Sequence, residues 1–517
     1  MYNSRSMKAT EFISHDEILS TLEYAKQNSS NRELIDSILE KAANYEGLDY
    51  REVAVLLRAQ DSETVAKIHA TAAKIKEHIY GNRIVMFAPL YLSNYCVNEC
   101  RYCGYHNSNC EMTRKKLTQE EIEKEVIALQ DMGHKRLALE LGEDPVNSSL
   151  EYLLESIKTI YSIKHDNGEI RRVNVNIAAT SVEDYRKLKE AGIGTYILFQ
   201  ETYNRDTYEY MHPKGPKHNY AYHTEAMDRA MEAGLDDVGI GVLLGLHDDY
   251  HYDAVGMMLH VKHLEDTFGV GPHTMSFPRI RAASEVELSQ YSGITDEKFY
   301  NLVAIFRLAV PYTGIIISTR ETMESRADLL KLGVSQLSGG SCTGVGGYDE
   351  MAKLEKVNTS QFDVEDHRTL DEITLDLAKN GYIPSFCTAC YREGRTGDRF
   401  MALAKVGQIG NVCQPNALMT LQEYLMDYAS PETKEIGEKV INLALLFVTI
   451  IVGVEIYRYR MSGLIQLSIE RLLFFVISVV LSYFINVFLN ITYGFTAFFF
   501  KNLWGSNMLK NCIISFM

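Results

Sequence analysis

Residues 96–103 read CVNECRYC and place Cys96, Cys100 and Cys103 in a C-x3-C-x2-C pattern. The motif follows an apolar segment at 83–88 (RIVMFA) that is typical of a buried strand. Three thiolates at this spacing can bind three irons of a cubane cluster and leave the fourth iron open for a small molecule. A tetrahedral zinc site with His106 as the fourth ligand is the alternative. The stretch therefore predicts a metal site directly after a first strand.

Short apolar runs alternate with amphipathic helical stretches beyond this motif. The eight candidate strands are 83–88, 136–141, 172–178, 194–199, 237–243, 273–277, 314–318 and 334–338. This alternation predicts an α/β fold, a (β/α)8 barrel of the TIM type, although a doubly wound open sheet would give a similar pattern. In either fold we expect the reactive groups at the carboxyl ends of the strands.

The chain of 517 residues is long enough for one enzyme barrel with extensions. Residues 1–80 are predicted to form an N-terminal helical extension and residues 81–340 the barrel. Residues 341–439 are predicted to form a C-terminal iron–sulfur domain, and residues 440–517 are an atypical apolar tail. The net charge of −16 argues against a nucleic-acid partner, because binding the phosphate backbone needs clustered Lys and Arg.

The nine cysteines are too sparse for a secreted scaffold held by disulfides, and the first residues lack the apolar core of a secretory signal. We therefore expect a reducing, cytoplasmic compartment, in which thiols can hold metal. Cys110 and Cys342 lie outside both cysteine motifs, and no ligand role is assigned to them.

A second cysteine triplet, Cys387, Cys390 and Cys413, has the pattern C-x2-C-x22-C. It can again bind a cubane with one open iron, and a zinc knuckle is the main alternative. Pro384 and the run Gly394–Gly397 predict a loop-rich cap around it rather than helix.

The first motif, placed after the first strand of a barrel, resembles the radical S-adenosylmethionine (SAM) superfamily. Together with the second triplet it resembles the HydG family, tyrosine lyases that mature [FeFe]-hydrogenase. The resemblance covers about residues 12–438 and includes GPHTMSFPRI (271–280) and GYIPSFCTACYREGRTG (381–397). The ThiH family of the thiamine pathway is also similar, but it lacks the second triplet.

The resemblance implies a [4Fe-4S] cluster on the first triplet, with SAM chelated to its open iron. The residues that match the family's SAM contacts are Tyr102, Glu140, Gly142, Glu143, Asn174, Asn176, Gln200, Glu201, Gly239 and Gly241. Two arginines that follow strands, Arg279 and Arg320, suit the carboxylate of a tyrosine substrate, with Ser318 as a further donor. Alternatively, one of these arginines pairs only with Glu321 or Glu324.

The resemblance also implies the reaction: L-tyrosine is split between Cα and Cβ into p-cresol and dehydroglycine, and dehydroglycine becomes CO and cyanide. A second [4Fe-4S] cluster with an extra iron and a bound free cysteine would carry that last step, with His273 as an iron ligand. The implied partners are an electron donor such as ferredoxin or flavodoxin and a scaffold protein of hydrogenase maturation.

His273 begins its candidate strand, so it should lie at the mouth opposite Cys96, on the order of 20 Å away. This position suggests that dehydroglycine travels through the barrel interior. The alternative functions are a ThiH-like 2-iminoacetate synthase and an iron–sulfur carrier without turnover.

The tail changes character at residue 440. An apolar run at 440–454 is followed by 29 residues without a charge at 472–500, longer than the roughly 20 that cross a bilayer. One interpretation is that the tail is native and anchors the protein in a membrane. Membrane association is then expected only if these residues belong to the natural protein. The other is a shifted reading frame that replaced a native helix.

Overall fold

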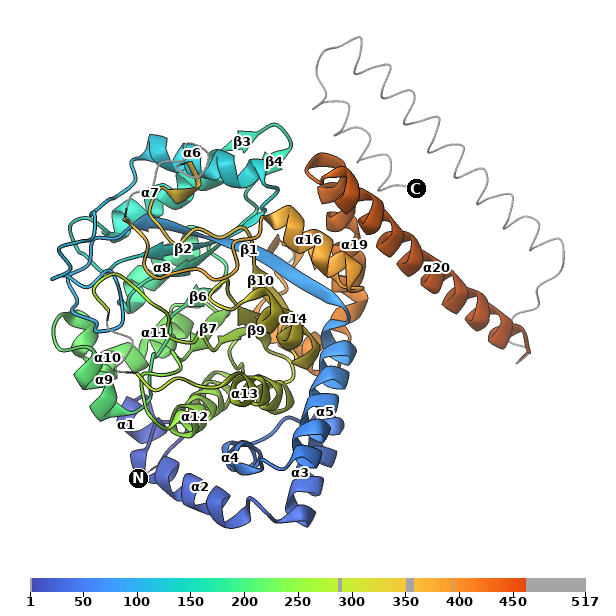
Figure 1. Cartoon of the computed structure of the whole chain (residues 1–517), viewed down its shortest axis with the longest axis horizontal. Coiled ribbons are helices and arrows are strands. Elements are labelled where there is room, and N and C mark those ends of the chain that lie inside the picture. The colour runs from blue at the N-terminus through green and yellow to red at the C-terminus, as the bar shows by residue number, and fades with distance from the viewer. Residues whose placement is uncertain (1, 287–290, 350–357, 393, 462–517) are drawn as a thin grey trace, which may run out of the picture. The chain divides into compact units, whose positions relative to one another are not determined.

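Eight parallel strands close into a barrel (Figure 1). The computed structural model describes residues 2–286, 291–349, 358–392 and 394–461. The barrel strands are β1 (Arg83–Ser93), β2 (Arg136–Leu141), β5 (Arg172–Asn176), β6 (Tyr196–Ile197), β7 (Val238–Gly241), β8 (Thr274–Ser276), β9 (Gly314–Ile317) and β10 (Gln336–Ser338). β10 pairs with β1, with Val85 opposite Gln336, and this pairing closes the barrel. The predicted (β/α)8 fold is therefore confirmed.

Helices follow the strands and cover the outside of the barrel (Figure 1). They are α6 (Gln119–Asp131), α7 (Leu150–Ser162), α8 (Val182–Glu190), α9 (Arg205–Met211), α10 (Tyr220–Thr224), α11 (Ala226–Glu232), α12 (Tyr250–Phe268), α13 (Asp296–Ala309) and α14 (Met323–Leu332). The start of α6 is fixed by the sequence, because Thr118 and Glu121 form a capping box. A short hairpin, β3 (Lys164–His165) and β4 (Gly168–Glu169), follows α7, and a 3-10 turn spans Pro216–His218.

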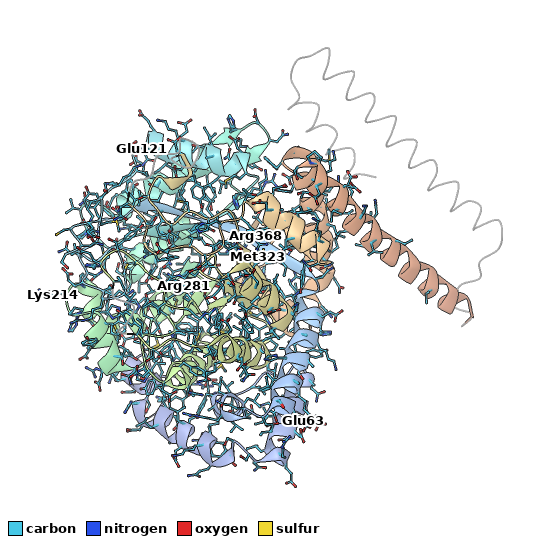
Figure 2. The ribbon with its side chains drawn as sticks, viewed as in Figure 1. Glu63, Glu121, Lys214, Arg281, Met323 and Arg368 are labelled. Carbon is cyan, nitrogen blue, oxygen red and sulfur yellow. The ribbon has the colours of Figure 1, made fainter. Side chains whose placement is uncertain are left out.

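Five helices precede the first strand: α1 (Ala9–Phe12), α2 (His15–Asn28), α3 (Arg32–Ala43), α4 (Tyr50–Arg58) and α5 (Ser62–Tyr80). Side chains of Asn31, Asp49 and Asp61 cap α3, α4 and α5. The apolar faces of α4 and α5 pack against α12 and α13. The extension thus belongs to the same hydrophobic core as the barrel, while charged side chains such as Glu63 and Lys214 lie on the outside (Figure 2).

The C-terminal part of the chain returns to the amino ends of the barrel strands. It consists of α16 (Leu370–Lys379), β11 (Ile383–Ser385), α17 (Ala389–Arg392), α18 (Gly397–Lys405) and α19 (Ile409–Asp427). β11 pairs with β1 from Arg83 to Val85, before β2 begins to pair at Ala88. Pro384 is tolerated because β11 is an edge strand. The expectation of a loop-rich cap was therefore wrong, since Cys390 lies in the four-residue helix α17 and Cys413 in the 19-residue helix α19.

Residues 1–441 form one compact unit, and residue 442 begins the second. The predicted boundaries at residues 80 and 340 lie within the first unit and stay predictions. The predicted apolar run at 440–454 lies in α20 (Pro431–Met461). Within the described part of the chain, no helix is both long and apolar enough to span a bilayer. The run at 472–500 lies outside the described residues.

Candidate active site at the two mouths of the barrel

The larger cavity, of about 230 Å³, lies at the carboxyl ends of the barrel strands. The loop after β1 carries the first cysteine triplet, and all three cysteines line the cavity. Asn94 fixes this loop, because its side chain donates to the carbonyl of Thr113 at 2.8 Å and accepts from the N–H of Lys115 at 2.7 Å. Arg114 donates to three carbonyls of the same loop. The irregular backbone around the cysteines is thus held by side chains of the same segment.

The segment 140–143 (ELGE), at the end of β2, packs directly against the cysteine loop. A Cβ at Gly142 would lie 2.4 Å from the carbonyl oxygen of Tyr95, so this approach requires glycine. Glu143 accepts a hydrogen bond from the side chain of Asn98 at 2.6 Å, and its carbonyl accepts from the N–H of Val97 at 2.8 Å. The acidic segment and the first triplet therefore form one unit.

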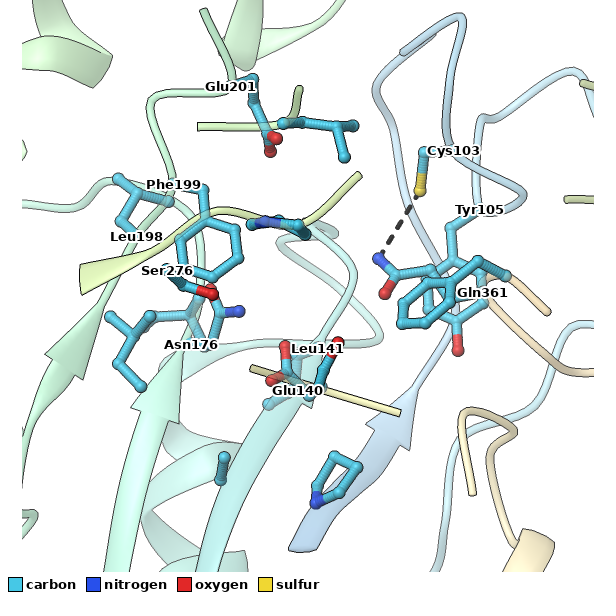
Figure 3. Close-up of a pocket in the computed structure, with 18 of the residues that line it drawn as sticks. Cys103, Tyr105, Glu140, Leu141, Asn176, Leu198, Phe199, Glu201, Ser276 and Gln361 are labelled. Carbon is cyan, nitrogen blue, oxygen red and sulfur yellow. Dashed lines mark hydrogen bonds between the residues drawn. The ribbon is translucent and has the colours of Figure 1, made fainter. Parts of the chain in front are cut away.

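Glu140 points into the cavity beside Asn176 (Figure 3). Burial raises the pKa of Glu140 to about 8, although Arg320 and the side chain of Asn176 oppose the shift. Arg320 also lines the cavity, with its guanidinium 3.4 Å from the ring centroid of Phe362. The backbone N–H of Arg320 donates to the Ser318 hydroxyl at 3.3 Å. The cavity thus offers a carboxyl for a cation and a guanidinium for a carboxylate.

Glu201 and Lys217 form an ion pair of 2.8 Å in the cavity wall. Burial lowers the pKa of Lys217, but the Glu201 carboxylate outweighs it and the net shift is upward. Tyr102, which also lines the cavity, has its hydroxyl 2.8 Å from Nε2 of His212. Lys217 was missed by the sequence analysis, because it lies in an irregular stretch without strand or helix periodicity. Asn98, between the cysteines, could have been found from its place in the motif.

Four predicted SAM contacts are absent from the described lining of this cavity: Asn174, Gln200, Gly239 and Gly241. The side chain of Asn174 instead accepts from Arg172, and that of Gln200 donates to the hydroxyl of Thr224. The glycines allow close packing, since a Cβ at either would lie 2.6 Å from the side chain of Thr274 or of Phe199. The structure gives these four residues a role within the fold.

Arg279 is the predicted substrate contact that the structure turns away from the cavity. Its guanidinium pairs with Glu321 and, at 2.6 Å, with Asp296. The sequence left open that one of the two arginines pairs with Glu321 and does not bind substrate. The structure shows this pairing for Arg279. Of the two candidates, Arg320 lines the cavity and Arg279 does not.

A second cavity, of about 70 Å³, lies at the amino ends of the barrel strands. Cys387, Cys390, Cys413 and His273 all line it. The pairing of β11 with the start of β1 brings Cys387 to this mouth, and α17 and α19 carry the other two cysteines. His273 precedes β8, and its N–H donates to the carbonyl of Val238 at 2.8 Å. The two triplets therefore occupy opposite mouths of one barrel.

The ring of His273 lies between a carboxylate and a phenol. Nδ1 is 3.4 Å from a carboxylate oxygen of Asp237, and Nε2 is 3.2 Å from the hydroxyl of Tyr391. The guanidinium of Arg172 lies over the ring of Tyr391 and 3.9 Å from Asp237, so the four side chains form a closed ring of contacts. Burial lowers the pKa of His273, which favours the neutral form that binds metals.

Four residues at this second cavity or beside it were not predicted: Arg136, Arg172, Asp237 and Tyr391. Arg136 donates to the carbonyl of Cys387 at 2.7 Å. Tyr391 directly follows Cys390, and this position was a usable signal. Arg136, Arg172 and Asp237 lie at the amino ends of strands, whereas reactive groups are expected at the carboxyl ends.

The eight cysteines that the structure describes are free thiols. Among the described residues, no three His, Cys, Asp or Glu side chains converge closely enough to hold one metal ion. Ligands of a single zinc ion would all lie about 2.3 Å from it, whereas the cysteines of a cubane each bind a different iron and are spaced further apart. Each triplet lines the wall of a cavity, so there is open space beside both sets of thiols.

Two family models match the chain. Residues 90–256 match the radical SAM superfamily, and residues 276–383 match the biotin and thiamin synthesis associated domain. The radical SAM match implies a [4Fe-4S] cluster and SAM as cofactors. Among curated proteins, the chain is similar to 2-iminoacetate synthase of Salmonella typhimurium, with 29% identity over 347 residues, which is 67% of this chain and 89% of that protein.

Two solved structures are more similar. The first is the crystal structure of HydG, a maturase of the [FeFe]-hydrogenase, with 54% identity and a TM-score of 0.82, covering 88% of this chain and 99% of that one. The second is the FeFe-hydrogenase maturase HydG of Carboxydothermus hydrogenoformans, with 40% identity and a TM-score of 0.74, covering 84% and 94% of the two chains. With this identity over nearly the whole of a solved relative, the chain belongs to the HydG family of radical SAM [FeFe]-hydrogenase maturases.

Proposed function

We propose that the protein cleaves L-tyrosine between Cα and Cβ into p-cresol and dehydroglycine, and converts dehydroglycine into CO and cyanide for the hydrogenase cofactor. The observation that carries this proposal is the presence of a cysteine-lined cavity at each mouth of one barrel, with His273 in the second. Two separated sites suit two successive reactions, with the product of the first as the substrate of the second.

The donor set of the first cavity fits a [4Fe-4S] cluster with SAM. Three thiols can bind three irons, while Tyr102, Gly142, Glu143 and Glu201 surround the space beside them. When bound there, cluster and SAM supply a radical that abstracts hydrogen. Arg320, with Ser318, would bind the tyrosine carboxylate and so fix the distance of the amino group from that radical.

The donor set of the second cavity fits another [4Fe-4S] cluster, with His273 available for an extra iron. We assign this site to the second cluster domain, residues 341–439, and expect a free cysteine molecule to bind there. Arg136 and Arg172 add positive charge around the cavity, which suits an anionic cluster and the carboxylate of dehydroglycine. We propose that dehydroglycine passes through the barrel interior from the first cavity to the second.

The decisive experiment is anaerobic incubation of the reconstituted protein with tyrosine, SAM and dithionite, with assays for p-cresol and CO. We expect both products. Exchange of Cys387 and Cys390 for Ala should keep p-cresol and abolish CO. Absence of p-cresol from the wild-type protein with both clusters loaded would refute lyase activity, and would favour an iron–sulfur carrier.

The second candidate function is 2-iminoacetate synthase, which the 29% identity to that enzyme favours. The same experiment separates the two functions, because this alternative predicts p-cresol without CO. In the cell we expect an electron donor such as ferredoxin or flavodoxin, and a maturation scaffold that receives the product.

A further inference from the structure

A segment from beyond the barrel covers the first cysteine triplet. The N–H of Gln361 donates to the carbonyl of Thr343 at 3.1 Å, and its own carbonyl accepts from the N–H of Gly104 at 3.3 Å. A Cβ at Gly104 would lie 2.9 Å from that carbonyl oxygen, so the glycine after Cys103 permits the approach. The backbone of Gln361 is therefore fastened to the cysteine loop itself.

The side chain of Gln361 reaches the cysteine sulfur. Its Nε2 lies 3.6 Å from Sγ of Cys103, a contact that Figure 3 draws as a dashed line. At the other end of the amide, the Tyr91 hydroxyl donates to Oε1 at 3.1 Å. Tyr91 is buried on β1, where Tyr105 packs edge-on against its ring. The amide is thus held in place by contacts with Tyr91 on a barrel strand and with the sulfur of Cys103.

The orientation of this amide follows from the chemistry of its partners. A cysteine sulfur that binds iron has lost its proton and can only accept hydrogen bonds. The NH2 group of Gln361 must then face Cys103, which leaves Oε1 to accept from Tyr91. The first triplet has one other side-chain amide near a sulfur, at Asn98, among the described residues. That amide lies 3.8 Å from Sγ of Cys96 and donates to Glu143 at 2.6 Å.

We propose that Gln361 raises the reduction potential of the cluster on the first triplet by donating an N–H to Cys103, with Tyr91 as its positioning residue. Reduction adds negative charge to the cluster and its sulfurs. A fixed N–H dipole aimed at a sulfur therefore stabilises the reduced form more than the oxidised form. The inference rests on the proposed function only in requiring a SAM-binding cluster on the first triplet.

The test is the midpoint potential of that cluster in the full-length reconstituted protein, followed by EPR. The signal that changes when SAM is added identifies the first cluster and separates it from the second. We expect Gln361→Leu to shift the midpoint to more negative potential, and Gln361→Glu, at a pH high enough to ionise the new carboxyl, to shift it further. Tyr91→Phe should give a smaller shift in the same direction, because it keeps the donor and removes its orientation.

A matched control is Gln119→Leu, since Gln119 accepts from Thr159 at 2.6 Å, away from both cavities. It should titrate at the wild-type potential. A further signature is that the Gln361 variants lose 5′-deoxyadenosine formation with a mild reductant and regain it with a stronger one.

Wild-type midpoints in iron-loaded Gln361→Leu and Gln361→Glu would overturn the inference while leaving the proposed function intact. If Gln361→Leu does not retain the cluster, the midpoint potentials of the isosteric Gln361→Glu and of Tyr91→Phe decide whether the inference holds. A wild-type protein without any SAM-sensitive signal would instead refute the proposed function.

Discussion

Glu140 combines a pKa of about 8 with a place on the wall of the SAM cavity. Below pH 8 this carboxyl is mostly protonated in the empty site, so accepting a hydrogen bond from the amino group of SAM as a carboxylate requires loss of its proton. The affinity for SAM should therefore rise with pH, by about tenfold between pH 6 and pH 7, and level off near pH 8. Calorimetric titration of the reconstituted protein with SAM measures this. Glu140→Gln should bind SAM weakly and without this slope, and a pH-independent wild-type affinity would contradict the assignment.

Asp237 is the acceptor nearest to Nδ1 of His273, at 3.4 Å. Nδ1 has no hydrogen-bond partner among the described residues, so a small approach to this carboxylate would fix the tautomer and leave Nε2 for a metal. We expect Asp237→Ala to weaken the binding of the extra iron by about 10- to 100-fold while the cluster on the three cysteines remains. Iron content and the rate of iron loss to a chelator measure this effect. Asp237→Asn keeps a hydrogen-bond acceptor and should lose less affinity for the extra iron than Asp237→Ala. Equal losses of affinity in the two variants would show that the negative charge of the carboxylate matters and the acceptor does not.

The individual residues that the sequence revealed are those whose chemistry depends on local spacing. The first triplet, the pair Cys387 and Cys390, and the ELGE segment could be recognised because their members lie within a few residues of each other or of a strand end, whereas Cys413 lies 23 positions after Cys390. Gln361 was not predicted, since it reaches its partner across the fold. Lys217 was not predicted either, although its partner Glu201 is only 16 positions away, because its stretch of sequence has no strand or helix periodicity. Gln361 lies 258 positions from Cys103, and no periodicity in the chain connects them.

At the scale of elements, the contact between the end of β2 and the cysteine loop leaves no room for a side chain at Gly142. Gly142→Ala should force Tyr95 and the loop apart, at a cost of roughly 1–3 kcal/mol. We expect a lower melting temperature and less iron at the first site, measured by calorimetry and iron analysis. Gly410→Ala on α19 is the control, because its nearest atom lies 4.0 Å away and alanine favours helix. Equal iron content in the two variants would contradict this prediction.

The eight barrel strands were predicted because each is an apolar run between helical stretches. β11 was missed because three residues that include Pro384 carry no strand pattern, and its pairing with β1 is decided by tertiary contacts. The same contacts explain the wrong expectation of loops around the second triplet. Glycines and a proline suggested irregular structure, whereas α17 and α19 bring Cys390 and Cys413 to the cavity wall.

At the scale of the whole molecule, β1 connects the two sites. Its carboxyl end leads into the first triplet, and its amino end pairs with β11, which leads into the second. Successive inward-facing residues of a neighbouring strand also connect them. On β2, Arg136 lines the second cavity, while Ala138 and Glu140 line the first. Ala138 is thus a small residue in the wall of the first cavity, two positions along β2 from a residue that lines the second.

Ala138 therefore offers a test of the proposed passage of dehydroglycine. Ala138→Leu adds three carbons to the barrel interior, at a position in the wall of the first cavity. If the intermediate crosses the barrel, p-cresol formation should stay near the wild-type rate, while CO formation falls on the order of tenfold or more. Single-turnover assays of both products, with iron content and SAM cleavage measured in parallel, separate transport from damage to either cluster. Ala138→Gly is the matched control and should form both products. Suppose that Ala138→Leu keeps both clusters but forms neither p-cresol nor CO. The new side chain then obstructs the first cavity, and the internal route loses its support. If the variant forms both products at wild-type rates, dehydroglycine takes another path to the second site.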